Sequence, residues 1–310
     1  MPTPYAYFQR NIIPLEQAKI SVMTHAFNYG TAVFEGIRGN WNAEENTLYL
    51  FRVREHCERL ARSSKILMLD LAESTEQLEQ LCVEIAERSG YTEDVYLRPL
   101  VYKSSEIVGV RLHGIESDTV IFITPFGPYL DIEKGARCHT STWRRVDDTG
   151  IPPRAKVTGI YVNSALAKTE ANLNGFDEAI MLNADGHVSE GSGENIFIIR
   201  NGKLITPSPA DNILEGITAD TVIELARNEL GIETVQRQID RSELYIADEI
   251  FMTGTAAHLT PVTEVDRRPV GDGRPGPLTR QLSSIFFDVI RGKNEKYKHW
   301  CTPARVRVPQ

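Results

Sequence analysis

Length, composition and charge place this 310-residue chain among ordinary folded proteins. Because domains usually contain about 100–200 residues, the length suggests two of them. A charged fraction of 25% and a hydrophobic fraction of 41% exclude intrinsic disorder, collagen and coiled coil. The net charge of −8 argues against a general nucleic-acid binder, so we expect small molecules as partners and no nucleic acid.

Membrane, disulfide and metal signals are weak in this sequence. No stretch approaches the roughly 18 consecutive apolar residues of a membrane helix, and the first residues do not resemble a leader, so we expect a cytoplasmic protein without membrane contact. The histidines show neither H-x-H nor H-E-x-x-H spacing, and we therefore expect no metal site. The cysteines lack C-x-x-C spacing and are expected to be free thiols: Cys57, Cys82, Cys138 and Cys301.

The N-terminal part of the chain predicts an α+β unit. Apolar periodicity indicates a helix over residues 54–69. Ser74 and Gln77 form a capping box for a second helix, which Gly90 ends. Strands are expected at residues 6–8, 19–22, 48–51, 95–102 and 119–124.

The stretch from Pro125 to Asp131 has no periodicity and is interpreted as a connection. We therefore expect a small α+β domain at residues 1–125, a connection at 126–137 and a larger domain at 138–310. In the larger domain, Asp185-Gly186 and Asn201-Gly202 predict two β-hairpins. Helices are expected at residues 163–174, 218–230 and 278–291, each followed by glycine, and a strand at 249–252.

Several common chemistries lack their markers. There is no G-x-x-x-x-G-K-[ST] sequence, hence no P-loop. The segment Gly191-Ser192-Gly193-Glu194 does not fit a dinucleotide fingerprint, because Ile196 replaces the third glycine and a strand follows. It is also too short for the nucleophile elbow G-x-S-x-G.

The start of the helix at residues 218–230 has two interpretations. Gly216-Ile217-Thr218 could expose backbone N–H groups to a phosphate at the positive end of the helix dipole. Thr218 could equally be an ordinary N-cap. The turn Gly254-Thr255 could add a hydroxyl donor or be a simple loop.

Read together and in order, several segments resemble the branched-chain amino-acid aminotransferases. The longest is HAFNYGTAVFEGIR at residues 25–38; the others are FRVREHCERL (51–60), YLRPL (96–100), KVTGIY (156–161), SEGSGEN (189–195), LEGIT (214–218) and TGTAA (253–257). The match extends over about residues 6–300. It implies a fold of mixed α+β and α/β character with two domains, like that of D-amino-acid aminotransferase: fold type IV of the pyridoxal 5′-phosphate (PLP) enzymes. It also implies a homo-oligomer, at least a dimer and up to a hexamer.

The resemblance assigns cofactor roles to residues that would otherwise look ordinary. It makes Lys156 the catalytic lysine that forms the aldimine, a task for an amine that can lose its proton. Glu190 becomes the partner of the pyridinium nitrogen, and Tyr161 the partner of the cofactor's O3′. Without it, Lys156 and Glu190 would be read as surface residues. The phosphate is expected to meet Arg59, Ile217, Thr218 and Thr255, with Glu194 in a supporting role.

The resemblance also implies a substrate pocket for amino acids and 2-oxo acids. Arg98 would bind the distal carboxylate of glutamate, while Tyr96 and the N–H groups of Thr255 and Ala256 would bind the α-carboxylate. Because apolar contacts discriminate by only about 1–3 kcal/mol per methylene, leucine, isoleucine and valine should all be accepted. The apolar wall would comprise Tyr29, Phe34, Phe126, Tyr129 and Tyr161, with Val110 supplied by a neighbouring subunit.

Two departures from the family pattern concern the substrate range. His258 stands where many members carry Glu, and Phe126 where some carry Trp; Arg111 is either a group that steers acidic substrates or an exposed side chain. The alternatives are a D-amino-acid or (R)-amine transaminase of the same fold, an aminodeoxychorismate lyase and a non-catalytic PLP-binding homologue. Arg98 and the Gly-Thr-Ala-Ala turn favour the branched-chain interpretation.

Overall fold

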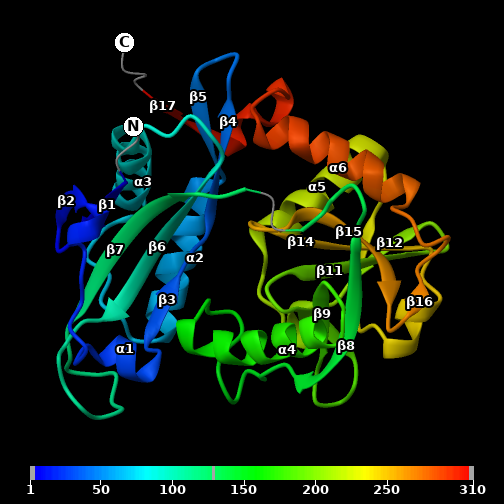
Figure 1. Cartoon of the computed structure of the whole chain (residues 1–310), viewed down its shortest axis with the longest axis horizontal. Helices are drawn as coiled ribbons and strands as arrows, with labels where there is room; N and C mark the ends of the chain where they lie inside the picture. Colours follow the sequence, from blue (N-terminus) through cyan, green and yellow to red (C-terminus); the bar gives the residue numbers. More distant parts are fainter. Residues whose placement is uncertain (1–3, 128–129, 307–310) are drawn as a thin grey trace. The chain divides into compact units, whose positions relative to one another are not determined.

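The computed structural model describes residues 4–127 and 130–306, which pack as two compact units (Figure 1). The first unit contains residues 4–127, 155–159 and 288–306, and the second contains 130–154 and 160–287. The units therefore interleave along the chain, whereas the sequence suggested a linear division at residues 126–137. The reason is pairing at long range: Val157 forms a β-bridge with Val33, and the C-terminal strand pairs with a strand of the N-terminal sheet.

The first unit is built on an antiparallel sheet. Its strands lie in the order β17-β5-β4-β6-β7-β1-β2, and β3 also pairs with β6. Of the strands expected here, 19–22 is wrong, because this segment is a loop whose Ile20 and Val22 side chains are exposed. The strands are β1 (Tyr5–Phe8), β2 (Asn11–Pro14), β3 (Ala32–Phe34), β4 (Ile37–Asn42), β5 (Thr47–Phe51), β6 (Val95–Lys103), β7 (Ser117–Pro125) and β17 (Cys301–Arg305).

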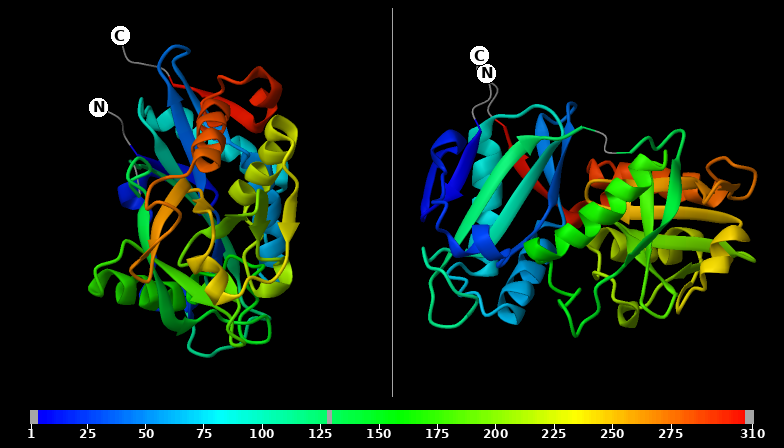
Figure 2. Two further views of the ribbon diagram at one scale, coloured as in Figure 1. Left: turned by 90° about the vertical axis from the view of Figure 1, so that its right-hand side faces the viewer. Right: turned by 60° about the horizontal axis from the view of Figure 1, so that its bottom comes forward.

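Helices α2 (Val53–Ile66) and α3 (Thr75–Ser89) pack against this sheet, as Figure 2 shows. The capping box of Ser74 and Gln77 is confirmed, and Gly90 ends α3 with a φ of 68°. The short helix α1 (His25–Tyr29) precedes β3. Short 3₁₀ helices occur in both units. Leu15–Gln17 and Glu295–Trp300 lie in the first unit, Pro209–Asp211 and Arg241–Tyr245 lie in the second, and Thr158–Ile160 lies where the chain passes from the first to the second.

The second unit is built on a mixed sheet in the order β10-β9-β8-β15-β14-β11-β12-β13, with β16 beside β15. Both predicted hairpins are confirmed, since β9 pairs with β10 and β11 with β12. Strand β8 is parallel to β9 and β15. The strands are β8 (Ala136–Arg144), β9 (Glu178–Leu182), β10 (Val188–Gly191), β11 (Asn195–Arg200), β12 (Lys203–Thr206), β13 (Thr234–Gln236), β14 (Glu249–Gly254), β15 (His258–Val265) and β16 (Arg268–Pro269).

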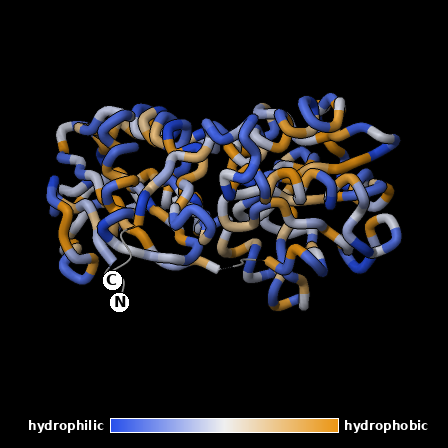
Figure 3. The backbone as a smooth tube through the Cα atoms, turned by 90° about the horizontal axis from the view of Figure 1, so that it is seen from above, coloured by the Kyte–Doolittle hydropathy of each residue, from blue (hydrophilic) through white to orange (hydrophobic). Residues whose placement is uncertain are grey.

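Alternating side chains let the second sheet pack on both faces. Ala179 and Met181 of β9 contact α4 (Tyr161–Leu173), whereas Ile180 and Leu182 belong to the main apolar cluster. Helix α5 (Ile217–Leu230) packs on β14, and α6 (Pro277–Ile290) ends in residues that belong to the first unit. Figure 3 shows that hydrophobic and hydrophilic stretches alternate along the chain within each unit.

Two further properties concern residues 4–127 and 130–306. Within these ranges no helix combines the length and the apolar character needed to cross a membrane. The four cysteines are free and buried.

Candidate active site

The backbone of Lys156 is held by the first unit. Its N–H donates to Ser63 Oγ of α2 (3.3 Å), and its carbonyl accepts from the Phe34 N–H (3.0 Å). Next to it, Gly159 N–H donates to the Gly30 carbonyl (3.2 Å), and a Cβ at Gly30 would lie 2.8 Å from Gly159 Cα. The predicted catalytic lysine is thus anchored between α2 and β3.

The ring of Phe34 gathers two cationic side chains. Lys156 Nζ lies 5.0 Å from the ring centroid and the Arg98 guanidinium carbon 4.3 Å from it. Arg98 also donates to Tyr96 Oη (3.0 Å). The structure therefore brings together four predicted site residues, Phe34, Tyr96, Arg98 and Lys156, and combines an apolar ring with positive charge.

Phe126 extends this cluster. Its ring centroid lies 5.3 Å from that of Tyr96, and the Arg38 guanidinium lies 4.9 Å above it. Arg38 also donates to the Gly127 carbonyl (3.2 Å). Gly36 cannot carry a side chain, because an added Cβ would collide with Tyr96 Oη.

Arg59 is buried on α2 and pairs with Glu35. Its Nε donates to Glu35 Oε1 (2.7 Å) and its Nη2 to Oε2 (2.8 Å). His56 Nδ1 donates to the same Oε2 (2.7 Å). The predicted phosphate ligand is therefore held by a carboxylate for which the sequence suggested no role.

Tyr29 and Val110 lie in one corner of the first unit. The Gly109 N–H donates to Tyr29 Oη (3.0 Å), and the buried His25 donates through Nε2 to the Gly109 carbonyl (2.6 Å). Val110 itself is 78% exposed. The corner thus presents an apolar side chain outward. Tyr129 lies outside the described residues.

Glu190 lies on β10 of the second unit and is surrounded by donors. Arg145 Nη2 lies 2.7 Å from Oε1, while the Leu214 N–H (3.0 Å) and Asn195 Nδ2 (3.3 Å) donate to Oε2. The side chains of Arg145 and Glu190 are both buried. Asn195 Nδ2 also donates to the Leu214 carbonyl (2.8 Å), which ties Glu190 to the segment before α5.

Glu194 is a buried acid that forms no ion pair with any of the described residues. Burial raises its pKa to about 8, and the charges of Glu178 and Glu190 act in the same direction. The Gly193 N–H donates to Glu194 Oε2 (3.0 Å). The charge of Lys168 lowers the pKa of Glu194, but its Nζ donates to Glu178 Oε2 (2.5 Å). Burial and the neighbouring acids therefore favour the protonated form of Glu194.

The remaining predicted residues begin helices or follow strands of the second unit. Ile217 and Thr218 open α5, whose N-cap Gly216 has no side-chain acceptor; an added Cβ there would collide with Asn195. Tyr161 is the first residue of α4. Thr255 and Ala256 follow Gly254, which approaches Glu194, since an added Cβ would lie 3.6 Å from Glu194 Cγ.

The structure thus forms two groups of site residues, one in each unit. Lys156 and Glu190 belong to different groups. Their placement at opposite ends of one ring stays a prediction. Sequence reasoning missed Glu35 and Arg145, the ionic partners of Arg59 and Glu190. One signal could have indicated Arg145: it directly follows a stretch in which the buried residues Ala136, Cys138 and Thr140 alternate with polar ones, which is typical of a strand.

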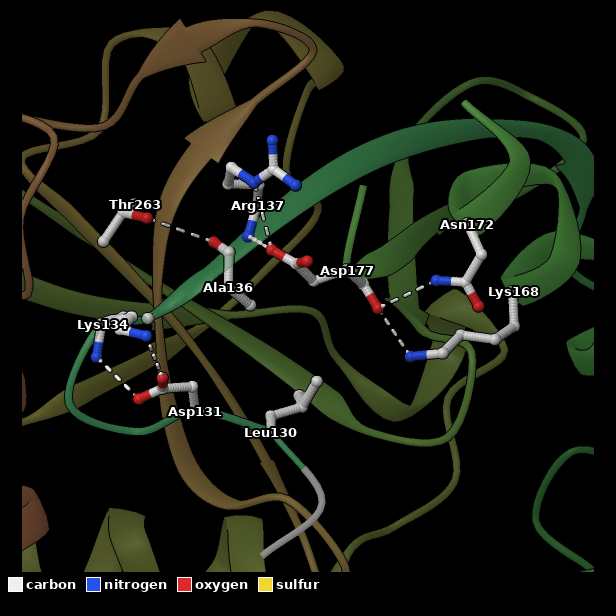
Figure 4. A pocket seen from close by; sticks show the side chains of 10 residues that line it. Leu130, Asp131, Lys134, Ala136, Arg137, Lys168, Asn172, Asp177 and Thr263 are labelled. Atoms are coloured by element: carbon white, nitrogen blue, oxygen red, sulfur yellow. Dashed lines mark hydrogen bonds and ion pairs between the residues drawn. The ribbon is translucent and has the colours of Figure 1, made fainter. Parts of the chain in front are cut away.

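A separate cavity of about 650 Å³ lies beside the start of β8 in the second unit. Figure 4 shows charged side chains of both signs around it, joined to each other by hydrogen bonds. For example, Arg137 Nε donates to Asp177 (3.3 Å) and Lys168 Nζ to the Asp177 carbonyl (2.7 Å). Its described lining contains none of the predicted site residues.

The sequence and the fold are both similar to known proteins. The sequence profile of the class IV amino-transferases matches residues 32–265. A probable branched-chain-amino-acid aminotransferase of Aquifex aeolicus is 52% identical over 299 residues, which cover 96% of each chain.

Two crystal structures also match nearly the whole chain. The branched-chain aminotransferase of Thermoproteus uzoniensis with norvaline superposes with a TM-score of 0.93 at 45% identity, over 97% of this chain and 99% of that one. The branched-chain amino acid aminotransferase of Thermobaculum terrenum in its PLP-form gives a TM-score of 0.93 at 38% identity, over 98% of this chain and 99% of that one.

Proposed function

This chain belongs to the class IV aminotransferase family and, within it, to the branched-chain aminotransferases, and from that premise we propose that it exchanges amino groups between L-leucine, L-isoleucine or L-valine and 2-oxoglutarate in reversible ping-pong half-reactions. The expected fold type IV class is confirmed by the same similarities. The single observation that carries the substrate proposal is the Arg98 guanidinium stacked on the apolar ring of Phe34.

The residues present fit PLP. Glu190 is a buried acceptor held by Arg145, and α5 begins without a side-chain cap. The hydroxyl of Thr253 is buried and has no hydrogen-bond partner within the described chain, and Thr253 is the register partner of Asn195, so both side chains leave the same face of the sheet. When bound, the cofactor supplies an aldehyde that takes the amino group and a ring that withdraws electrons from the substrate.

Each polar residue has a distinct task in this proposal. Lys156 holds the cofactor, and its amine carries the proton to and from the substrate α-carbon. Glu190, whose Oε1 lies 2.7 Å from Arg145 Nη2, would accept from the ring nitrogen and keep it protonated. Tyr161 binds the cofactor's O3′. The phosphate is bound by Arg59, the N–H groups of Ile217 and Thr218, and Thr255, with Glu194 in support.

Substrate binding needs one pocket for an aliphatic side chain and for a carboxylate. Arg98 lies on the ring of Phe34, so an apolar substrate meets the rings and an acidic one meets the guanidinium. The α-carboxylate is bound by Tyr96 and the N–H groups of Thr255 and Ala256. The apolar wall comprises Tyr29, Phe34, Phe126, Tyr129 and Tyr161.

The working state is proposed to be a homo-oligomer, at least a dimer, in the cytoplasm. The corner that holds Tyr29 carries exposed apolar side chains, among them Val22, Phe27, Val108 and Val110, which a second copy would cover. In that dimer Val110 completes the neighbour's pocket. Free buried thiols are typical of a reducing compartment.

A half-reaction screen separates the transaminase alternatives. The holoenzyme is mixed in turn with L-leucine, D-alanine and (R)-1-phenylethylamine, and conversion of the cofactor is followed by absorbance. We expect L-leucine to react fastest. Faster reaction with D-alanine or the (R)-amine would assign the chain to those activities.

A second test concerns turnover itself. We expect a yellow protein that converts leucine and 2-oxoglutarate to 4-methyl-2-oxopentanoate and glutamate, quantified by chromatography of both products. A colourless preparation that stays inactive after addition of PLP would refute the proposal.

A further inference from the structure

Glu35 is a buried carboxylate that the proposed chemistry leaves without a role. It follows β3 in the first unit, and its side chain is fully buried. Three nitrogen donors from one face of α2 reach it, Arg59 Nε and Nη2 and His56 Nδ1, at 2.7–2.8 Å. A buried charge is costly unless it is fully paired, and here both carboxylate oxygens are paired.

We propose that Glu35, supported by His56, is a positioning residue that fixes the guanidinium of Arg59 for the cofactor phosphate. This inference rests on the proposed function, in which Arg59 binds that phosphate. Glu35 contacts Arg59 through the edge formed by Nε and Nη2, so the plane and direction of the guanidinium are set by a two-point contact. A single hydrogen bond would leave the group free to rotate.

The ionisation of the cluster supports this geometry. Burial would raise the pKa of Glu35, but the Arg59 charge and the hydrogen bonds from Arg59 and His56 hold it well below the ordinary value. Burial lowers the pKa of His56 in spite of Glu35, and the charges of Arg59 and Lys156 act in the same direction. The cluster at neutral pH is therefore a carboxylate, a guanidinium and a neutral imidazole.

The same elements also hold Lys156. The Glu35 N–H donates to the Pro99 carbonyl (2.7 Å), and the preceding Phe34 N–H donates to the Lys156 carbonyl (3.0 Å). Ser63, two turns after His56 on α2, accepts from the Lys156 N–H. Glu35 thus ties Arg59 to the end of β3, whose Phe34 N–H binds the Lys156 carbonyl, so the same elements hold the phosphate anchor and the lysine backbone.

The test measures how strongly the protein recognises the phosphate. Full-length protein is stripped of cofactor, and the dissociation constants of PLP and of pyridoxal, which lacks the phosphate, are measured by equilibrium dialysis. For Glu35→Gln, which keeps the shape and removes the charge, we expect PLP to bind roughly 10- to 100-fold more weakly and pyridoxal to bind unchanged. Glu58→Gln on the exposed side of α2 is the matched control and should change neither constant.

An equal loss for PLP and pyridoxal would overturn the proposal, because it indicates a merely structural role. Tighter PLP binding would overturn it too, because Glu35 would then compete with the phosphate. Arg59→Lys gives a second measurement that does not depend on Glu35→Gln folding. Lysine keeps the charge but cannot make two hydrogen bonds to the Glu35 carboxylate. The variant should therefore lose its preference for PLP over pyridoxal, called phosphate discrimination here, in the same way. Unchanged discrimination in Arg59→Lys would also contradict the proposal.

The proposed function fails in a different way. If the unmodified chain binds neither compound, it is not a PLP enzyme. If it binds PLP and Arg59→Ala leaves the ratio of the two constants unchanged, the phosphate role of Arg59 is wrong. Loss of discrimination in Arg59→Ala but not in Glu35→Gln would refute only the positioning role.

Discussion

The first unit gathers cations around its site residues, whereas the second gathers acids. Lys156, Arg59 and Arg98 lie near Phe34 or Glu35 in one, and Glu178, Glu190 and Glu194 lie buried in the other.

Two carboxyl groups show what the difference does. Glu35 and Glu194 are both buried, yet the pKa of Glu35 is lowered and that of Glu194 is raised to about 8. Burial opposes ionisation of both groups. Glu35 stays charged because Arg59 donates two hydrogen bonds to its carboxylate, and Glu194 has no such partner among the described residues.

The largest effect is expected when the proposed catalytic cation of the first unit is removed by Lys156→Ala. Loss of the amine should lower turnover by roughly 10²- to 10⁴-fold, because it removes the group proposed to carry the proton at the substrate α-carbon. PLP should still bind noncovalently through its phosphate. Steady-state rates and equilibrium dialysis check both statements, with the exposed Lys203→Ala as control. Preserved turnover would mean that the amine lies elsewhere.

The corresponding change in the second unit is Glu190→Gln. The amide cannot hold a proton on the ring nitrogen, and Arg145 loses its buried counter-ion, so kcat should fall by roughly 100-fold. Single-turnover kinetics with leucine measures the effect. Glu233→Gln at the surface is the control. A kcat equal to that of the control would remove Glu190 from the cofactor contact.

Arg98→Ala tests the cation that lies on an apolar ring. A hydrogen bond to a charged group contributes about 1.5–3 kcal/mol, so the KM for 2-oxoglutarate should rise by roughly 10- to 100-fold. The KM for leucine should change much less. Arg88→Ala on the exposed side of α3 serves as control. Equal changes for both substrates would contradict the distal-carboxylate role.

The smallest effect concerns Glu194 and pH. Its pKa is raised from 4.5 to about 8 on folding, so the folded state binds one more proton than the unfolded state between these values. Its contribution to stability must therefore fall as pH rises, by at most about 1.4 kcal/mol per pH unit. The free energy of unfolding of Glu194→Gln, measured with urea between about pH 5 and pH 8, should lack this pH-dependent contribution. An identical pH dependence in both proteins would show that Glu194 is ionised.

Local signals predicted much of the fold. The capping box of Ser74 and the Asn201-Gly202 hairpin are confirmed, because each depends on residues only a few positions apart. The strand predicted at 19–22 is wrong because this segment is an exposed loop that pairs with no described strand. Strand β17 was missed because its partner β5 lies some 250 residues earlier, where no local pattern indicates it.

The order of motifs along the chain determined the family, the cofactor and the identity of the candidate site residues, since those depend on residue type and spacing. Only the tertiary structure decided which charges meet. The pairs Glu35–Arg59 and Arg145–Glu190 join residues 24 and 45 positions apart, and both pairs are buried with contacts of 2.7 Å. These quantities arise when separate segments pack together, so they have no counterpart in the spacing of residues along the chain.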